Sequence, residues 1–356
     1  MTVVEDAIPD DRVERLHADA TVVDTHNDLL MLVSRQAPGR QAAYFRERWL
    51  PQLLAGGVDV QVLPVFIDDD FRPEGALRQT LRMIEAAYRL VDGNPDDVAL
   101  CRDATEIDAA LGDGRIALVL ALEGCEAIGI DVELLRTMAR LGVRMVSFTH
   151  FGRTALADGS AEDSAGSRLT AAGVAAVTLL EELGVLIDVS HLSGAGTDHV
   201  LELATRPVVA SHSSAWAVRA HHRNLTDERL KRIAALGGVV GVNFFHGFID
   251  PEHATMARLV DHIEHIADVA GIDAVGLGPD FVKEVFEQLT PPMLAGGDFE
   301  GMSGTMTIPG LDGPAGLPLV TAELARRGWE DDDVRKVLGG NWLRVFRSDL
   351  GVALKR

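Results

Sequence analysis

The chain has 356 residues, of which 47% are hydrophobic and 24% charged, and this supply of apolar side chains predicts a folded globular protein rather than a disordered one. Its 54 acidic and 33 basic residues give a formal net charge of −21, which argues against a general affinity for nucleic acid or anionic membranes. The two cysteines, Cys101 and Cys125, are too few for a disulfide framework and lack metal-ligand spacing, so we interpret both as packing residues.

Neither end of the sequence carries a recognisable targeting or anchoring signal. The first 20 residues, "MTVVEDAIPDDRVERLHADA", are acidic and contain no apolar signal-peptide core, and the final "DLGVALKR" has no anchor pattern. No apolar run reaches the roughly 18 residues that a membrane-spanning helix needs. We therefore expect a cytoplasmic protein with no membrane partner.

Short apolar runs rich in β-branched residues recur along the chain, with helix-like segments between them. We count eight such runs, which lie at 21–26, 58–67, 116–124, 144–150, 185–191, 207–212, 238–245 and 274–280. Helical patterns separate them, such as "ALRQTLRMIEAAYRLV" and "LTAAGVAAVTLLEELG", and Gly184 ends the second where a helix C-terminus is expected. Strands alternating with helices are typical of a parallel sheet with crossover helices.

These eight runs favour an α/β fold of the (β/α)8 TIM-like barrel type, with the active site at the C-terminal ends of the strands. A doubly wound open sheet is the alternative, but no G-x-G-x-x-G or Walker pattern follows the first strand. We expect one barrel domain over residues 1–356, with an N-terminal extension at 1–19 and a long loop at 281–316 after the last strand. The Gly-, Pro- and Met-rich part of that loop, 289–316, is a candidate lid.

Six of the eight runs end, or nearly end, in residues that bind metals or move protons, namely His26 with Asp28, Glu123, His150, His191, His212 and Asp280. Strand ends converge at one mouth of an α/β barrel, so these side chains are expected to meet. One such residue alone is more often a structural hydrogen-bonding group than a ligand. The agreement of six strand ends outweighs that interpretation.

The residue types indicate two metal ions rather than one. His26, Asp28, Glu123, His191 and His212 suit Zn²⁺ and exceed what one tetrahedral ion needs. Two ions roughly 3.5–4 Å apart need a bridging ligand. In some barrel hydrolases a carbamylated lysine is the bridge, but no lysine stands at the end of the third or fourth run; the lysines are Lys231, Lys283, Lys336 and Lys355. Glu123 is therefore the candidate bridge.

The chain resembles the membrane (renal) dipeptidase family of the amidohydrolase superfamily. The motifs "DTHND", "LEG", "FTH", "LIDVSH", "ASHSSAW", "HHRN" and "GGNWLRV" occur in the family's order between about residues 20 and 348. The resemblance implies a (β/α)8 barrel with two Zn²⁺ ions bridged by Glu123 and a water or hydroxide. It assigns one zinc to His26, Asp28 and Glu123, and the other to Glu123, His191 and His212.

The resemblance also implies the roles of three further residues. His150 would polarise the substrate carbonyl, Arg223 of "HHRN" would bind the substrate's free carboxylate, and Asp280 would handle the proton. General chemistry agrees: a hydroxide formed between two metals can attack a peptide carbonyl, and an arginine fork matches a carboxylate. The expected function is a zinc-dependent dipeptidase acting on small dipeptides with a free C-terminal carboxylate. A homodimer is implied by the family, although no residue points to one.

Three positions depart from the family pattern and leave alternatives open. Cys125, Phe151 and Val282 change the expected pocket wall without removing a ligand. The same metal site could therefore act on another amide, a lactam or a peptide-like metabolite. A non-catalytic barrel that only binds is the third alternative, and the complete ligand set argues against it.

Other polar residues near these motifs receive lesser roles. Asp24 is expected to orient His26 or its turn. His221 and His222 flank Arg223 and are expected to shape the carboxylate pocket. His262 and His265 have a spacing that could bind metal, but a partly exposed helical face explains them better.

Overall fold

The computed structural model describes residues 11–288 and 307–352. All eight predicted runs form strands, and together with one short additional strand they make up the β-structure of the described chain. The strands are β1 (Val22–Asp24), β2 (Val58–Phe66), β3 (Val98–Leu100), β4 (Ile116–Glu123), β5 (Val143–Ser147), β6 (Leu186–Asp188), β7 (Val208–Val209), β8 (Val240–Val242) and β9 (Val275–Leu277).

The strands form a curled parallel sheet rather than a continuous closed barrel. The larger sheet has the order β1-β2-β4-β5-β6-β7, with β3 paired to β4, and a second sheet contains β8 and β9. Within the described residues, isolated parallel bridges connect the two sheets in place of a continuous ladder, Ala210 with Val240 on one side and Asn27 with Phe281 on the other. The prediction of an α/β fold with parallel strands is confirmed, and a full eight-stranded ladder is not.

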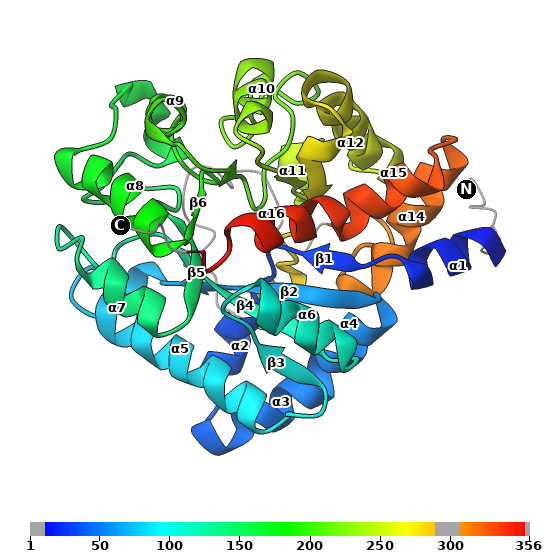
Figure 1. The fold of residues 1–356 in the computed structure, drawn as a ribbon, viewed down its shortest axis with the longest axis horizontal. Coiled ribbons are helices and arrows are strands. Elements are labelled where there is room, and N and C mark those ends of the chain that lie inside the picture. The colour runs from blue at the N-terminus through cyan, green and yellow to red at the C-terminus, as the bar shows by residue number, and fades with distance from the viewer. Residues whose placement is uncertain (1–10, 289–306, 353–356) are drawn as a thin grey trace.

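Helices surround the curled sheet (Figure 1). Their bounds are α1 (Asp11–Asp19), α2 (Leu29–Arg35), α3 (Gln41–Arg48), α4 (Leu50–Ala55), α5 (Ala76–Asp92), α6 (Ala104–Gly112), α7 (Leu134–Arg140), α8 (Ala171–Leu183), α9 (Gly194–Leu203), α10 (Asp227–Ala235), α11 (His246–Ile249), α12 (Met256–Ala270), α13 (Lys283–Gln288), α14 (Leu317–Arg326), α15 (Asp331–Arg335) and α16 (Asn341–Asp349). Both helices anticipated from the sequence are present as α5 and α8, and Gly184 caps α8 with a left-handed φ of 66°. None of the helices in the described part of the chain is long and apolar enough to cross a membrane.

The alternation of side chains between the two faces of a strand explains why the Glu123 side chain lies at the mouth of the curled sheet. Ala117, Val119 and Ala121 of β4 pack in the inner cluster together with Val60 of β2. Successive side chains of a strand point to opposite faces, so Glu123 continues the same inward-facing row. Because Glu123 is the last residue of β4, its carboxylate lies at the C-terminal edge of the sheet.

The "GGNW" motif packs beneath the first and last strands. Trp342 is fully buried, and a Cβ added to Gly276 of β9 would lie 2.4 Å from its Nε1 atom. A Cβ added to Gly339 would lie 2.3 Å from the backbone oxygen of Thr21. Asn341 donates hydrogen bonds to the backbone oxygens of Ile272 and Val275. This motif therefore serves packing at the end of the sheet remote from Glu123.

The expected N-terminal extension and the expected long loop each contain a helix. The expected extension at 1–19 includes α1, where His17 Nδ1 lies 2.7 Å from Thr321 Oγ1 of α14. The expected loop at 281–316 includes α13, whose Val285 is buried in the core. The candidate lid falls largely on 289–306, which lies outside the described residues.

Candidate metal centre

The residues predicted for the metal centre lie at the C-terminal ends of the parallel strands. His26 follows the end of β1 by two residues. His150, His191, His212 and Asp280 each lie three residues beyond the last residue of β5, β6, β7 and β9. This common offset explains why residues that are far apart in the sequence share one site.

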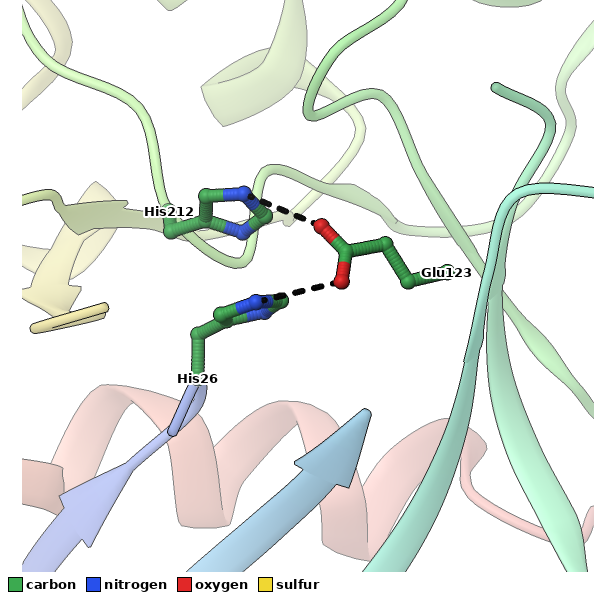
Figure 2. Close-up of side chains that lie close together, drawn as sticks. All are labelled: His26, Glu123 and His212. Carbon is green, nitrogen blue, oxygen red and sulfur yellow. Dashed lines mark ion pairs between the residues drawn. The ribbon is translucent and has the colours of Figure 1, made fainter. Parts of the chain in front are cut away.

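Glu123 lies between histidines from two sides of the mouth (Figure 2). Its Oε2 atom is 3.4 Å from His26 Nε2, and its Oε1 atom is 3.1 Å from His191 Nε2 and 3.7 Å from His212 Nε2. All four side chains are at most 6% exposed. One carboxylate thus presents each oxygen to a different imidazole group, which is the arrangement that a bridging ligand requires.

Two aspartates complete the cluster on the side of His26. Asp28 Oδ1 and Asp280 Oδ1 each lie 4.0 Å from His26 Nε2. Donor atoms of His26, Asp28 and Asp280 lie within 4.8 Å of one another, as do those of His26, Glu123 and His212. Glu123, His150 and His191 form a third such group. The structure therefore brings all five predicted ligands together. His150 and Asp280 each lie in the same groups as some of these ligands.

The donor set fits divalent cations. Carboxylate oxygens and neutral imidazoles are the ligand types that Zn²⁺ accepts. Among the described residues, the buried Asp28 Oδ1 and His191 Nδ1 atoms have no hydrogen-bond partner. A buried carboxylate oxygen without a hydrogen bond is costly in an apolar protein interior, and a coordinated cation removes that cost.

Burial and charge divide the histidines into two kinds. Burial, reinforced by Arg223, lowers the pKa of His191 well below its usual value, and burial followed by His26 does the same for His212. Burial opposes the charged form of His26 as well, but Glu123, Asp280 and Asp28 outweigh it and raise the pKa of His26 to about 10. His191 and His212 are thus neutral imidazoles, whereas His26 is surrounded by carboxylates that favour its charged form.

Asp280 and His191 have unusual backbone conformations. Their φ values are 58° and 65°, and they are the only non-glycine residues with positive φ in the described chain. Such conformations cost energy for residues with a Cβ and cluster at functional sites. The backbone amide of Asp280 donates to the backbone oxygen of His26 at 2.9 Å, which joins the last strand end to the first.

The ring of Phe151 lies near both His150 and Arg223, beside the metal centre. The ring of Phe151 is edge-on to His150 at 4.5 Å and to His191 at 4.8 Å between centroids. The guanidinium carbon of Arg223 lies 6.0 Å from the centroid of Phe151 and 5.4 Å from that of Phe248. Arg223 is 3% exposed and donates from Nη2 to the backbone oxygen of His212 at 3.0 Å. Arg223 is therefore not an ordinary surface arginine.

Several supporting residues were not singled out by sequence reasoning. Asn243 donates to Asp280 Oδ2 at 2.8 Å, and Asp188 and Ser211 lie behind His212. All three are buried polar residues at or just beyond the end of a strand, and that position was the signal available in the sequence. Asp24 has the expected supporting position, since its Oδ1 accepts a hydrogen bond from the backbone amide of His26 at 3.0 Å.

The expectation of a partly exposed face for His262 is wrong. His262 is fully buried, its Nδ1 accepts from the backbone amide of Ala215, and its Nε2 lies 3.2 Å from the backbone oxygen of Ile249. His265 pairs with Asp227 at 2.8 Å. These contacts give both residues structural roles away from the metal centre.

Comparison with known proteins agrees with this geometry. The pattern of the membrane dipeptidase family (peptidase family M19) matches residues 10–291 and 294–354. Dipeptidase verJ of Clonostachys rogersoniana is 30% identical over 371 aligned residues, which cover 98% of this chain and 90% of that protein.

Two solved structures show the same fold. Dipeptidase AC, described as a metallo-peptidase of family M19, has a TM-score of 0.81 at 26% identity, covering 94% of this chain and 99% of the other. A metallo-peptidase from Rhodobacter sphaeroides, solved with a phosphinate mimic of the dipeptide L-Ala-D-Ala, has a TM-score of 0.81 at 25% identity, covering 93% and 99%. The resemblance inferred from the motifs is thereby confirmed: this chain belongs to the membrane dipeptidase family, M19, and is a hydrolase of the metallopeptidase class.

Proposed function

We propose that this enzyme hydrolyses the peptide bond of small dipeptides with a free C-terminal carboxylate, using two Zn²⁺ ions that share Glu123. The observation that carries the proposal is the position of the Glu123 carboxylate, with one oxygen facing His26 and the other facing His191 and His212. His26 and Asp28 would hold one ion, and His191 and His212 the other. The two sheets would then act together as a single barrel mouth.

When bound, the two ions supply a nucleophile from water at neutral pH and polarise the scissile carbonyl. Asp280 would move the proton: its Oδ1 lies 4.0 Å from His26 Nε2, while Asn243 donates to its Oδ2 at 2.8 Å. Burial raises the pKa of Asp280, which suits a group that accepts a proton from water and passes it to the leaving amine.

His150 and Arg223 would orient the substrate. Burial, together with Arg72 and Arg223, lowers the pKa of His150 to about 3, so its ring is neutral and can donate an N–H to the oxygen of the carbonyl as negative charge develops. Arg223 offers planar N–H donors that match a carboxylate. The structure of the Rhodobacter sphaeroides relative with a dipeptide mimic supports a dipeptide as the substrate.

The test is a screen of L,L and L,D dipeptides with purified protein whose zinc content has been measured. We expect hydrolysis of at least one class, and Asp280→Asn should retain metal while its kcat falls by about 10²- to 10⁴-fold. If the metal-loaded protein cleaves none of the dipeptides, the proposal is contradicted.

A second candidate keeps the metal centre and changes the substrate to another amide, a lactam or a peptide-like metabolite. Phe151 favours it, because this ring narrows the space between His150, His191 and Arg223. The same screen, extended to β-lactams and N-acylated dipeptides, separates the two candidates by their values of kcat/KM.

A further inference from the structure

A chain of hydrogen bonds runs from His212 into the protein behind the metal centre. His212 Nδ1 lies 2.7 Å from Ser211 Oγ, and Ser211 Oγ lies 2.5 Å from Asp188 Oδ2. The other oxygen of Asp188, Oδ1, accepts from the backbone amides of Ser190 and Ser211, both at 2.9 Å. Asp188 is the last residue of β6, and its side chain is fixed by these three contacts.

The chemistry of the three groups determines where the protons lie. An ionised carboxylate can only accept, and Asp188 Oδ2 at 2.5 Å is a much closer acceptor for the single hydroxyl proton of Ser211 than Ser190 Oγ at 3.3 Å, so that proton is donated to Asp188. The Ser211 oxygen can then only accept from the imidazole, so His212 carries its proton on Nδ1. That assignment leaves a lone pair on His212 Nε2, which faces His191 Nε2 at 2.7 Å and Glu123 Oε1 at 3.7 Å.

We propose that Asp188 and Ser211 are positioning residues that hold His212 in the Nδ1–H tautomer and thereby keep its Nε2 lone pair available to a metal ion. This inference rests on the metal centre of the proposed function. The inference concerns only the position of the proton on His212. It can therefore be wrong even if the protein is a dipeptidase, and it can be right even if the substrate is not a dipeptide. Groups that orient a ligating histidine typically change metal affinity by about 10- to 100-fold when removed.

His191 provides an internal comparison. Its Nδ1 atom is buried and, within the described residues, has no hydrogen-bond partner. The two histidines on the same side of Glu123 therefore differ at Nδ1: in His212 this atom contacts Ser211, which is held by Asp188, whereas in His191 it has no such contact among the described residues. Loss of the Ser211 and Asp188 contacts is expected to alter His212 and leave the tautomer of His191 unchanged.

The test uses Asp188→Asn and Ser211→Ala, with Ser190→Ala as the matched control. In Asp188→Asn, the new amide donates to the Ser211 oxygen, so the serine proton turns towards His212 Nδ1 and favours the Nε2–H tautomer. Ser211→Ala removes the acceptor without imposing either tautomer. Ser190 Oγ accepts from the backbone amide of His212 at 3.0 Å and lies 3.3 Å from Ser211 Oγ. Its removal therefore deletes a hydroxyl from the same cluster while the contacts of Ser211 Oγ with Asp188 and with the His212 ring remain.

Two measurements decide the outcome. The ¹⁵N chemical shifts of His212 in metal-free protein should show the Nδ1–H form in the native chain and in Ser190→Ala, and a shift towards Nε2–H in Asp188→Asn. Competition between the protein and a chelating indicator for Zn²⁺ should show about 10- to 100-fold weaker binding at one of two sites in Asp188→Asn and Ser211→Ala. An unchanged tautomer in Asp188→Asn would overturn the proposal, as would equal loss of zinc affinity in Ser190→Ala.

Discussion

Glu123 connects the two halves of the candidate metal centre through its two carboxylate oxygens. Burial by itself would raise the pKa of Glu123, but the interaction with His26 outweighs this effect, so the pKa of Glu123 is lowered. The carboxylate is therefore ionised at neutral pH and able to accept two cations. The sequence predicted Glu123 as the bridge, because the other candidate, a lysine at a strand end, is lacking there.

Arg223 should determine the requirement for a free carboxylate. Arg223→Gln is expected to reduce kcat/KM for a dipeptide by about 10- to 100-fold, which corresponds to the loss of about 1.5–3 kcal/mol from a charge-assisted hydrogen bond. The effect should be much smaller on the same dipeptide with an amidated C-terminus, because that substrate has no carboxylate to lose. Steady-state kinetics on both substrates checks this, and an equal loss on the two would contradict the assigned role.

Phe151 should limit the size of the substrate's C-terminal side chain. Its ring contacts His150 and His191 and lies near Arg223, so in the proposed function it would border the space between the scissile carbonyl and the carboxylate of a bound dipeptide. Phe151→Ala is expected to raise kcat/KM for dipeptides ending in Leu or Phe relative to those ending in Gly. A preference that does not change across such a series would show that Phe151 lies outside the substrate pocket.

At the level of helices and strands, the sequence predicted the strands that are buried on both faces and missed elements that are partly exposed. All eight apolar runs became strands, because burial on both faces leaves a strong signal. β3 was missed since two of its three residues are only partly buried, whereas strands of the same length such as β6 and β8 are fully buried. α13 was missed because it has only six residues and directly precedes the Gly- and Pro-rich stretch at 289–316.

His262 of α12 shows a limit of helical periodicity. Its face was expected to be partly exposed, yet the residue packs beneath the 215 and 249 segments and hydrogen-bonds to both. Those contacts come from the connection after β7 and from α11, which cannot be located by reading α12 alone. The error therefore came from tertiary packing rather than from the helix assignment.

The buried state of His262 predicts a pH dependence of stability. Burial lowers the pKa of His262 to about 4 from an ordinary value of 6.5. The unfolded chain thus binds more protons than the folded one between these values, so stability is lost as the pH falls through that window. Between pH 7 and pH 5 this residue should cost about 2 kcal/mol of unfolding free energy.

The measurement is urea unfolding of the native chain and of His262→Gln at pH 7 and pH 5. Glutamine can accept from the Ala215 amide and donate to the Ile249 oxygen, but it does not titrate. The variant should lose about 2 kcal/mol less than the native chain over this pH range. Identical losses in the two proteins would show that His262 does not contribute.

At the scale of the whole molecule, local sequence patterns could not establish how the sheet closes. β8 and β9 pair with each other, and they meet the larger sheet through isolated bridges and backbone contacts such as Asp280 N to His26 O. Closure depends on the register and curvature of all the strands together, which no single segment specifies. That residues 1–356 form a single domain likewise stays a prediction.

The mouth of the curled sheet nevertheless assembles the site in a way that follows from the topology. Parallel strands end at the same edge, and residues two or three positions beyond each end reach a common centre. The ligand types could therefore be predicted from strand ends, whereas the supporting contacts of Asn243, Ser211 and Asp188 could not. Those contacts depend on which strands are neighbours and how their ends are turned.

The central claim is that five side chains hold two metal ions on either side of Glu123. Its most direct test is a crystal structure of the zinc-loaded protein, with anomalous diffraction at the zinc edge and metal analysis of the same sample. We predict two zinc peaks per chain, roughly 3.5–4 Å apart, each next to a different oxygen of Glu123, and loss of at least one peak in Glu123→Gln. A single peak, or two peaks that persist unchanged in Glu123→Gln, would contradict this account.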